Sequence, residues 1–258
     1  MRVCVNNELL YENGSYRMDL EALDRLASSP KAKMMILCSP HNPVGRVWTR
    51  DELQRLVNLA NRYGVVVVSD EIHADFSLDG RKQTRILALD GAERAVMLTS
   101  ATKSFNLAGL RQSSIIVRDA AIRETLGKAI ERAHATSPNI FGEIAQTTAY
   151  LYGDEWMDAV VEYVTENRDY AVDFIRREIP EIHCRPQEGT YLTWLDFRGL
   201  GMAHEAMMSM LVNRAHVALN SGLFFGEEGR GWFRMNLATQ RDNVARGLEN
   251  IRDAIRSR

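Results

Sequence analysis

Long apolar runs are missing from this sequence of 258 residues, and so is a large excess of either charge. No apolar segment approaches the length of a membrane-spanning helix. The formal net charge is only −2, without the basic stripe typical of nucleic-acid binding. Internal repeats and low-complexity tracts are absent as well. We therefore expect a chain whose partners include neither a membrane nor a nucleic acid.

Cysteine is also scarce, being limited to Cys4, Cys38 and Cys184. These residues lack C-x-x-C spacing, and an odd number of cysteines favours free thiols in a reducing compartment. The opening segment 1–7 is too short and too polar for a signal peptide, and its pattern predicts a strand followed by a turn. These features predict a cytoplasmic protein.

The first half of the chain alternates short apolar runs with amphipathic segments, which predicts an α/β domain with a mostly parallel sheet sandwiched by helices. Thr49 is a candidate helix cap and Gly64 a candidate helix end. The expected strands are Arg2–Val5, Met34–Cys38, Val65–Ser69, Ala95–Thr99 and Ser113–Val117, and the expected helices are Asp19–Ala27, Asp51–Tyr63 and Asp119–His134.

The second half predicts a smaller α+β domain, which we place at residues 155–258, after a large domain of residues 1–154. The pattern change falls near a long helical segment, Glu155–Arg177, and Pro180 closes that segment. A helical stretch ending at Tyr152 precedes it. The expected strands are Ile182–Arg185, Thr190–Asp196, Val217–Asn220 and Trp232–Leu237, and the expected helices are Ala203–Arg214 and Arg241–Ile255.

Three charged residues follow predicted strands in a pattern that suits one cofactor. Lys103 and Arg111 come after the strand Ala95–Thr99, and Asp70 ends the apolar run that begins at Val65. Ligands of open α/β sheets bind beyond the carboxyl ends of the strands. A lysine that forms a Schiff base, an acid for the ring nitrogen and an arginine for the phosphate suit pyridoxal phosphate. Taken singly, each residue is more often a surface or capping residue, so the prediction depends on the set.

Other catalytic motifs fail at their second element. Ser100 to Lys103 fits the S-x-x-K pattern of penicillin-binding enzymes, but the required S-D-N and K-T-G are absent. His204 and Glu205 lack the second histidine of a zinc helix. Gly226, Gly229 and Gly231 do not form a G-x-G-x-x-G turn. Because the zinc helix lacks its second histidine, the sequence predicts no metal site.

The lysine segment belongs to a wider set of short motifs: Ser39–Trp48, Ser69–Asp75, Ser100–Asn106, Gly109–Arg111 and Phe233–Asn236. Together they resemble the aminotransferase class I/II family of fold-type I pyridoxal-phosphate enzymes. Within that family, the chain is most similar to the cystathionine β-lyase (C–S lyase) subgroup. Trp48 and His73 favour that subgroup over ordinary aminotransferases.

This resemblance implies cofactor-binding roles for individual residues. Lys103 matches the catalytic Schiff-base lysine, which also takes the substrate α-proton once its amine is displaced. Asp70 matches the partner of the pyridine nitrogen. Asn42 matches the donor to the phenolic oxygen of the cofactor. His73 occupies a position aimed at the same oxygen in many relatives, although a buried structural histidine is an open alternative.

The resemblance also implies two anion-binding groups. Ser100 and Arg111 match ligands of the cofactor phosphate. Arg234 matches the arginine that holds the α-carboxylate of an amino-acid substrate. Its alternative is a surface arginine at a strand edge.

The chain departs from the family at its start, where relatives carry a further segment before the point that matches Met1. In the family, that segment supplies a helix N-terminus for the phosphate and an aromatic ring against the pyridine. Tyr11 and Tyr16 lie too late in the chain for this ring, in a segment expected to be a loop after a strand. We expect a fragment of a longer gene or a misplaced start, with apolar surface left uncovered.

The leading expectation is a pyridoxal-phosphate-dependent carbon–sulfur β-lyase that acts on cystathionine or a cysteine S-conjugate. An aminotransferase on the same scaffold is the first alternative. A non-catalytic, regulatory binding protein or an inactive fragment is the second. The family also implies a homodimer with a small amino-acid substrate.

Overall fold

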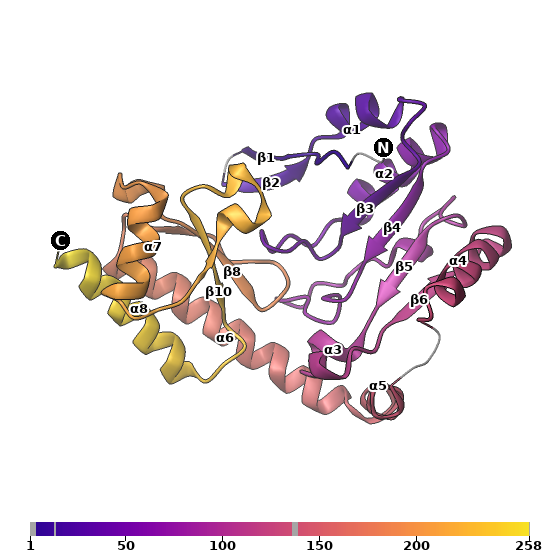
Figure 1. Cartoon of the computed structure of the whole chain (residues 1–258). Coiled ribbons are helices and arrows are strands. Elements are labelled where there is room, and N and C mark those ends of the chain that lie inside the picture. The colour runs from indigo at the N-terminus through magenta and orange to yellow at the C-terminus, as the bar shows by residue number, and fades with distance from the viewer. Residues whose placement is uncertain (1–3, 13, 136–138, 258) are drawn as a thin grey trace. The chain divides into compact units, whose positions relative to one another are not determined.

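The computed structural model describes residues 4–12, 14–135 and 139–257 (Figure 1). The chain divides into two compact units. The N-terminal unit contains the described residues up to His41, together with Arg46–Asp75 and Lys82–Met157. The C-terminal unit contains Asn42–Gly45, Phe76–Arg81 and the chain from Asp158 onward. The domain boundary between residues 154 and 155 remains a prediction.

A mixed four-stranded sheet, ordered β3-β4-β5-β6, forms the centre of the N-terminal unit. The first three strands are parallel, and β6 pairs antiparallel with β5. The strands are β3 (Met34–Cys38), β4 (Val66–Asp70), β5 (Val96–Thr99) and β6 (Ser114–Val117). Helices flank this mostly parallel sheet, so the predicted α/β fold class is confirmed.

Helices α1 (Leu20–Ala27) and α2 (Arg50–Arg62) enclose the core of this unit together with the sheet. Helix α2 begins as predicted, because the Thr49 side chain accepts from the Glu52 backbone and the Glu52 carboxylate returns to the Thr49 backbone. Leu53, Leu56 and Val57 recur at helical spacing and are buried. The remaining helices of the unit are α3 (Ala101–Ser104), α4 (Ala120–Arg132) and α5 (Ile140–Tyr152).

Part of the apolar surface of this unit is exposed. Strand β3 buries Leu37, whereas Ile36, on the opposite face of the sheet by strand alternation, is 67% exposed. On helix α5, Ile140, Phe141 and Ile144 are exposed as well. These side chains remain exposed although they are apolar.

Two N-terminal predictions differ from the structure. In the expected strand Arg2–Val5, the first two residues lie outside the described part, whereas Cys4 and Val5 belong to no strand and are exposed. The expected loop between Tyr11 and Tyr16 is instead a hairpin of β1 (Leu9–Glu12) and β2 (Ser15–Met18). The two tyrosines are cross-strand partners with ring centroids 4.7 Å apart, and such aromatic pairs stabilise a hairpin.

The C-terminal unit has an antiparallel four-stranded sheet, ordered β7-β8-β10-β9. Leu195, Phe197, Phe233 and Met235 share a buried core with residues of the three helices of this unit. The strands are β7 (His183–Cys184), β8 (Leu192–Asp196), β9 (Asn220–Ser221) and β10 (Trp232–Asn236), and the helices are α6 (Asp154–Glu178), α7 (His204–Asn213) and α8 (Arg241–Arg256). The predicted α+β character is present.

Strand β9 is later and shorter than the predicted strand Val217–Asn220. His216 has a positive φ of 53°, and the Val217 N–H donates to the Leu211 carbonyl of α7. The backbone at Val217 is therefore committed to the end of a helix and cannot enter the sheet ladder.

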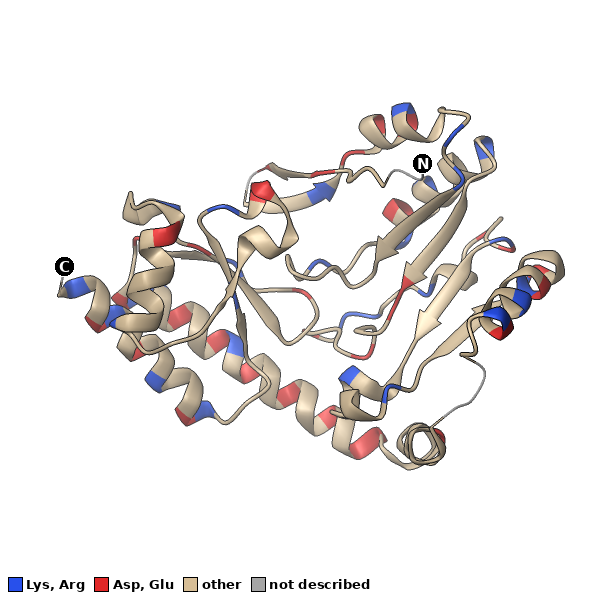
Figure 2. Ribbon diagram, viewed as in Figure 1, with Lys and Arg blue, Asp and Glu red and all other residues tan. Residues whose placement is uncertain are grey.

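Charges of both signs are interspersed along α4 and α8 (Figure 2). The exposed Lys128–Glu124 pair on α4, at 2.6 Å, is typical, and exposed pairs of this kind contribute little stability. Throughout the described ranges, we find no helix with the length and apolarity needed to cross a membrane.

Candidate active site

Neighbouring parallel strands of the N-terminal unit bring the acid and the lysine segment to one edge of the sheet. Asp70 is the last residue of β4, where it pairs with Cys38 on β3 and with Leu98 on β5. Strand β5 ends one residue later, at Thr99, and Ser100 follows. The carboxyl ends of parallel strands meet at the same edge of a sheet, and this edge is where α/β proteins bind ligands.

Lys103 lies on a short helix that begins directly after this edge. Helix α3 starts because the Ser100 side chain caps it, accepting from the Thr102 N–H at 3.0 Å. Across the described residues, the Lys103 ammonium forms no hydrogen bond or ion pair. Its amine is therefore available to a ligand.

The two residues predicted to bind the cofactor phosphate differ in their surroundings. Ser100 is buried, and its hydroxyl donates to the Gln112 carbonyl at 2.6 Å. Arg111 is exposed and has a positive φ of 52°, at the end of the 3-10 turn Ala108–Leu110. Capping and the Gln112 contact already use the polar atoms of Ser100, so Arg111 is the more accessible anion ligand of the two.

Asp70 ends β4, and His73 lies on the turn that follows. The Asp70 carboxylate accepts from the Ile72 N–H at 3.3 Å and is partly exposed. His73 is 4% exposed, so it is a buried residue of this turn. The turn is closed by a hydrogen bond from the Ala74 N–H to the Glu71 carbonyl.

A polar network behind this edge was not predicted from the sequence. The fully buried Glu71 carboxylate accepts from Ser69 Oγ at 3.0 Å and from the Ile86 N–H at 2.8 Å. Arg85 bridges Glu71, at 3.4 Å, to Asp75, at 3.1 Å. Asp75 in turn accepts from Ser104 Oγ at 2.6 Å, on the residue that follows Lys103. The network joins the turn after β4 to the helix of the lysine, and the acids in Ser69–Asp75 were its only sequence signal.

Glu71 is expected to make the stability of the N-terminal unit depend on pH. Loss of hydration on burial raises the pKa of Glu71, and hydrogen bonds and Arg85 offset this only in part. As pH rises above the usual value near 4.5, the unfolded chain releases a proton that the folded carboxyl retains. The free energy of unfolding should then fall by up to about 1.4 kcal/mol per pH unit until the raised pKa is passed.

Urea unfolding between pH 4 and pH 7 measures this dependence. A Glu71→Gln variant, which cannot titrate, should show a shallower decline over the same pH window. Equal slopes for the two proteins would contradict the assignment.

Arg234 is the centre of a second polar group, in the C-terminal unit. It lies on β10 directly opposite Asn220 of β9. Its Nη2 donates to Asn220 Oδ1 at 2.9 Å, and its Nη1 donates to Asn42 Oδ1 at 2.8 Å. The guanidinium carbon lies 5.0 Å from the centroid of the Phe225 ring. Two neutral amides and an aromatic face therefore orient the guanidinium.

The guanidinium of Arg234 keeps its positive charge uncompensated. Within the described part of the chain, no carboxylate forms an ion pair with it, and its Nε is buried without a hydrogen-bond partner. Loss of hydration lowers the pKa of Arg234 from its usual value. A half-buried cation held by neutral groups is matched by an anionic ligand, which would supply the missing charge.

Asn42 is the first residue of a tight loop, Asn42–Gly45, that packs within the C-terminal unit. The Gly45 carbonyl accepts from Glu188 N at 2.8 Å and from Gly189 N at 3.0 Å. Gly45 has a φ of 71°, and a Cβ there would lie 2.3 Å from Gln187 Cβ. Only glycine satisfies both the backbone conformation and the close approach.

Replacing Gly45 by alanine is expected to lower the free energy of unfolding of this unit by about 2–5 kcal/mol, because strain and overlap act together. Gly201→Ala is the matched control: its φ is 64°, but nothing lies within 4 Å of the added Cβ. The control should lose only about 1 kcal/mol. Urea unfolding of the two variants compares them, and equal losses would contradict the close-packing argument.

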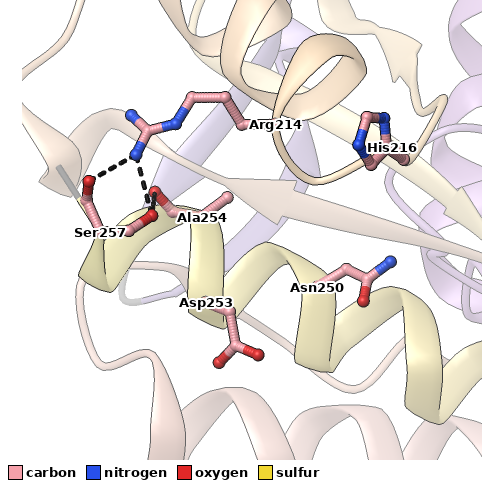
Figure 3. Close-up of a pocket in the computed structure, with 6 residues that line it drawn as sticks. All are labelled: Arg214, His216, Asn250, Asp253, Ala254 and Ser257. Atoms are coloured by element: carbon pink, nitrogen blue, oxygen red, sulfur yellow. Dashed lines mark hydrogen bonds between the residues drawn. The ribbon is translucent and has the colours of Figure 1, made fainter.

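A shallow hollow elsewhere on the C-terminal unit contains none of the predicted residues (Figure 3). It is lined by Arg214, His216, Asn250, Asp253, Ala254 and Ser257. Arg214 donates there to the carbonyl and to the hydroxyl of Ser257, so its charge is used to hold the end of α8. No cluster of three or more potential ligands for a metal ion occurs among residues 4–12, 14–135 and 139–257.

The structure thus distributes the predicted residues over two groups. The N-terminal unit carries Lys103, Asp70, His73, Ser100 and Arg111, and the C-terminal unit carries Asn42 and Arg234. A strand-end acid and lysine on an α/β sheet form a candidate ligand site, and the arginine without an ion pair is a second candidate.

Comparison with known proteins identifies the family. The sequence profile of "Aminotransferase class I and II" matches residues 5–251, and the chain belongs to this family. The family resemblance predicted from short motifs is therefore confirmed.

The relatives include a protein with the name of the subgroup that the motifs indicated. Cystathionine beta-lyase PatB of Bacillus subtilis is 34% identical over 98% of this chain. Protein MalY of Escherichia coli is 35% identical over 93% of it. The crystal structure of cystalysin from Treponema denticola, which contains a pyridoxal 5'-phosphate cofactor, superposes with a TM-score of 0.94 at 34% identity over 98% of this chain. The chain spans less than two thirds of each of these relatives: 66%, 61% and 65% of their lengths.

Proposed function

We propose that this chain carries the catalytic residues of a pyridoxal-phosphate-dependent carbon–sulfur β-lyase. The observation that carries the proposal is the unpaired Lys103 amine on the helix that follows β5, beside the strand that ends in Asp70. Similarity to proteins named as cystathionine β-lyases supports this reaction over others of the family. The substrate class is an L-amino acid with a sulfur leaving group on its β-carbon.

The residues of the N-terminal unit fit the cofactor by their chemistry. Lys103 offers a primary amine with no competing partner in the described chain, which an aldehyde requires. Asp70 offers a partly exposed carboxylate for a protonated ring nitrogen, and Arg111 an exposed guanidinium for a phosphate. When bound, pyridoxal phosphate supplies an aldehyde that captures amines and a cationic ring that withdraws electrons from the substrate α-carbon.

Each residue then has one task. Lys103 would hold the cofactor, and its amine, once released, would take the proton from the substrate α-carbon. Asp70 would keep the ring nitrogen protonated by charge pairing. Arg234 would bind the substrate α-carboxylate, and Asn42, whose oxygen accepts from Arg234, would be the donor to the phenolic oxygen of the cofactor. Cleavage of the Cβ–S bond releases a thiol, and hydrolysis of the remainder gives pyruvate and ammonia.

Release of pyruvate from cystathionine by the purified chain with added pyridoxal phosphate tests the proposal. We expect pyruvate in proportion to thiol, and none from a Lys103→Ala variant. Amino transfer to a keto acid without pyruvate release would instead favour an aminotransferase. Neither product, together with retained binding to a protein partner, would favour a regulatory protein.

We also propose that the protein acts in the cytoplasm as a homodimer. Free thiols at Cys4, Cys38 and Cys184 support the reducing compartment. The exposed apolar side chains of α5 support an association that covers them. Sedimentation equilibrium of the purified chain distinguishes a dimer from a monomer.

A further inference from the structure

A buried histidine outside the predicted set contacts β10, which carries Arg234, and β9, which carries Asn220. His204 is the first residue of α7 and is 5% exposed. In the sequence, His204 was considered only as part of an incomplete zinc-binding motif. Its ring stacks on Phe233 of β10, with centroids 4.8 Å apart and planes 1° from parallel. A buried imidazole of this kind needs partners for both of its nitrogens.

Both ring nitrogens have such partners. Nδ1 lies 3.0 Å from the backbone nitrogen of Gly231, which can only donate, so Nδ1 is the acceptor. The proton of the neutral ring is therefore on Nε2, which donates to Ser221 Oγ at 2.8 Å. Ser221 Oγ also accepts from the Leu223 N–H, at 3.3 Å. The hydrogen bonds thus assign one tautomer.

These contacts lie next to the residues that orient the guanidinium. Ser221 follows Asn220, whose side-chain oxygen accepts from Arg234 Nη2. Gly231 precedes β10, and Phe233 is both the neighbour of Arg234 and the ladder partner of Ser221. Strand β9 has only two residues, so its own ladder constrains it weakly.

We propose that His204 is a positioning residue for the carboxylate-binding Arg234. It clamps β9 through Ser221 and β10 through Gly231 and Phe233, which keeps Asn220 against the guanidinium. This inference rests on the proposed function of Arg234 and names a residue that acts through it. His204 contacts neither substrate nor cofactor in this role.

The test separates carboxylate recognition from cofactor chemistry. The probe is 3-(methylthio)propanoate, which has a thioether and a carboxylate but no amine, and its dissociation constant is measured by calorimetry on the full chain. His204→Leu leaves Gly231 N–H and the Ser221 hydroxyl without their partner, and we expect it to weaken binding about tenfold. His204→Gln, whose amide offers one acceptor and one donor, should restore most of the affinity. His183→Gln, at an exposed position on β7, should leave it unchanged.

Three further readouts guard against a purely structural effect. Ser221→Ala should reproduce the loss of affinity seen in His204→Leu, even if that variant folds poorly. Nitrogen NMR of the wild-type ring should show a protonated Nε2 and a bare Nδ1. Covalent trapping of pyridoxal phosphate on Lys103 should be the same in wild type and His204→Leu.

The outcomes decide between the claims. Equal probe affinity in wild type and His204→Leu, absence of probe binding to the wild type, failure of His204→Gln to rescue, or a proton on Nδ1 would each overturn the positioning role. Loss of trapping in the wild type, with probe affinity still dependent on His204, would overturn the proposed function and leave the positioning role intact.

Discussion

Replacing Lys103 by alanine is expected to abolish β-lyase turnover, with a loss of at least about a thousandfold. The loss is this large because one amine both holds the cofactor and moves the α-proton. Borohydride reduction of the wild-type protein with pyridoxal phosphate should fix the cofactor to the peptide that contains Lys103. Peptide mapping by mass spectrometry and pyruvate release measure the two effects in parallel.

The control for this prediction is Lys128→Ala. Lys128 is exposed on α4, where its ammonium pairs with Glu124, so its loss should leave both trapping and turnover unchanged. A cofactor tag on any lysine other than residue 103 would exclude the assignment. So would full turnover by the Lys103→Ala variant.

Replacing Arg234 by alanine is expected to lower kcat/KM for cystathionine by about 100- to 1000-fold. Most of the loss should appear in KM, because the guanidinium binds the α-carboxylate before the reaction and throughout it. Arg234→Lys keeps the charge, but one ammonium cannot engage Asn42, Asn220 and a carboxylate in the planar geometry of arginine. We therefore expect the lysine variant to recover only part of the activity in steady-state kinetics.

Arg198→Ala supplies the matched control in the same unit. Arg198 also lies over an aromatic ring, that of Trp232, but its charge is paired with Asp196 at 2.7 Å. Its removal should change kcat/KM by less than about threefold, because neither Arg198 nor Asp196 belongs to the proposed site. The buried Asp196 carboxylate loses its partner, so the free energy of unfolding should fall instead. An Arg198→Ala variant as impaired as Arg234→Ala would indicate a general effect of lost packing and would refute a specific carboxylate site.

The candidate residues of the N-terminal unit were predictable because their signals are local. The β-branched run before Asp70 specifies a buried strand, and the polar residues after it mark the strand end. The apolar run before Ser100 likewise specifies a strand. Because the two strands are parallel neighbours, their carboxyl ends lie at one edge of the sheet. The roles assigned to Asp70, Lys103 and Arg111 remain predictions, although the structure places them where such roles are possible.

Contacts between distant parts of the chain were not predictable in the same way. Nothing near Asn42 in the sequence indicates that its oxygen accepts from Arg234, and nothing near Asn220 indicates a functional residue. The hydrogen bond from Ser100 to the Gln112 carbonyl and the link from Ser104 to Asp75 likewise appear only once the chain is folded.

By itself, the sequence determined the α/β class, the family and the identity of the candidate lysine, because hydrophobic period and short motifs are properties of neighbouring residues. Tertiary structure alone decided which polar atoms are already satisfied and which are left for a ligand. The Ser100 hydroxyl belongs to the first kind, and the Lys103 amine belongs to the second. The reason is physical: hydrogen-bond partners separated by many residues meet only when the strands that carry them pair.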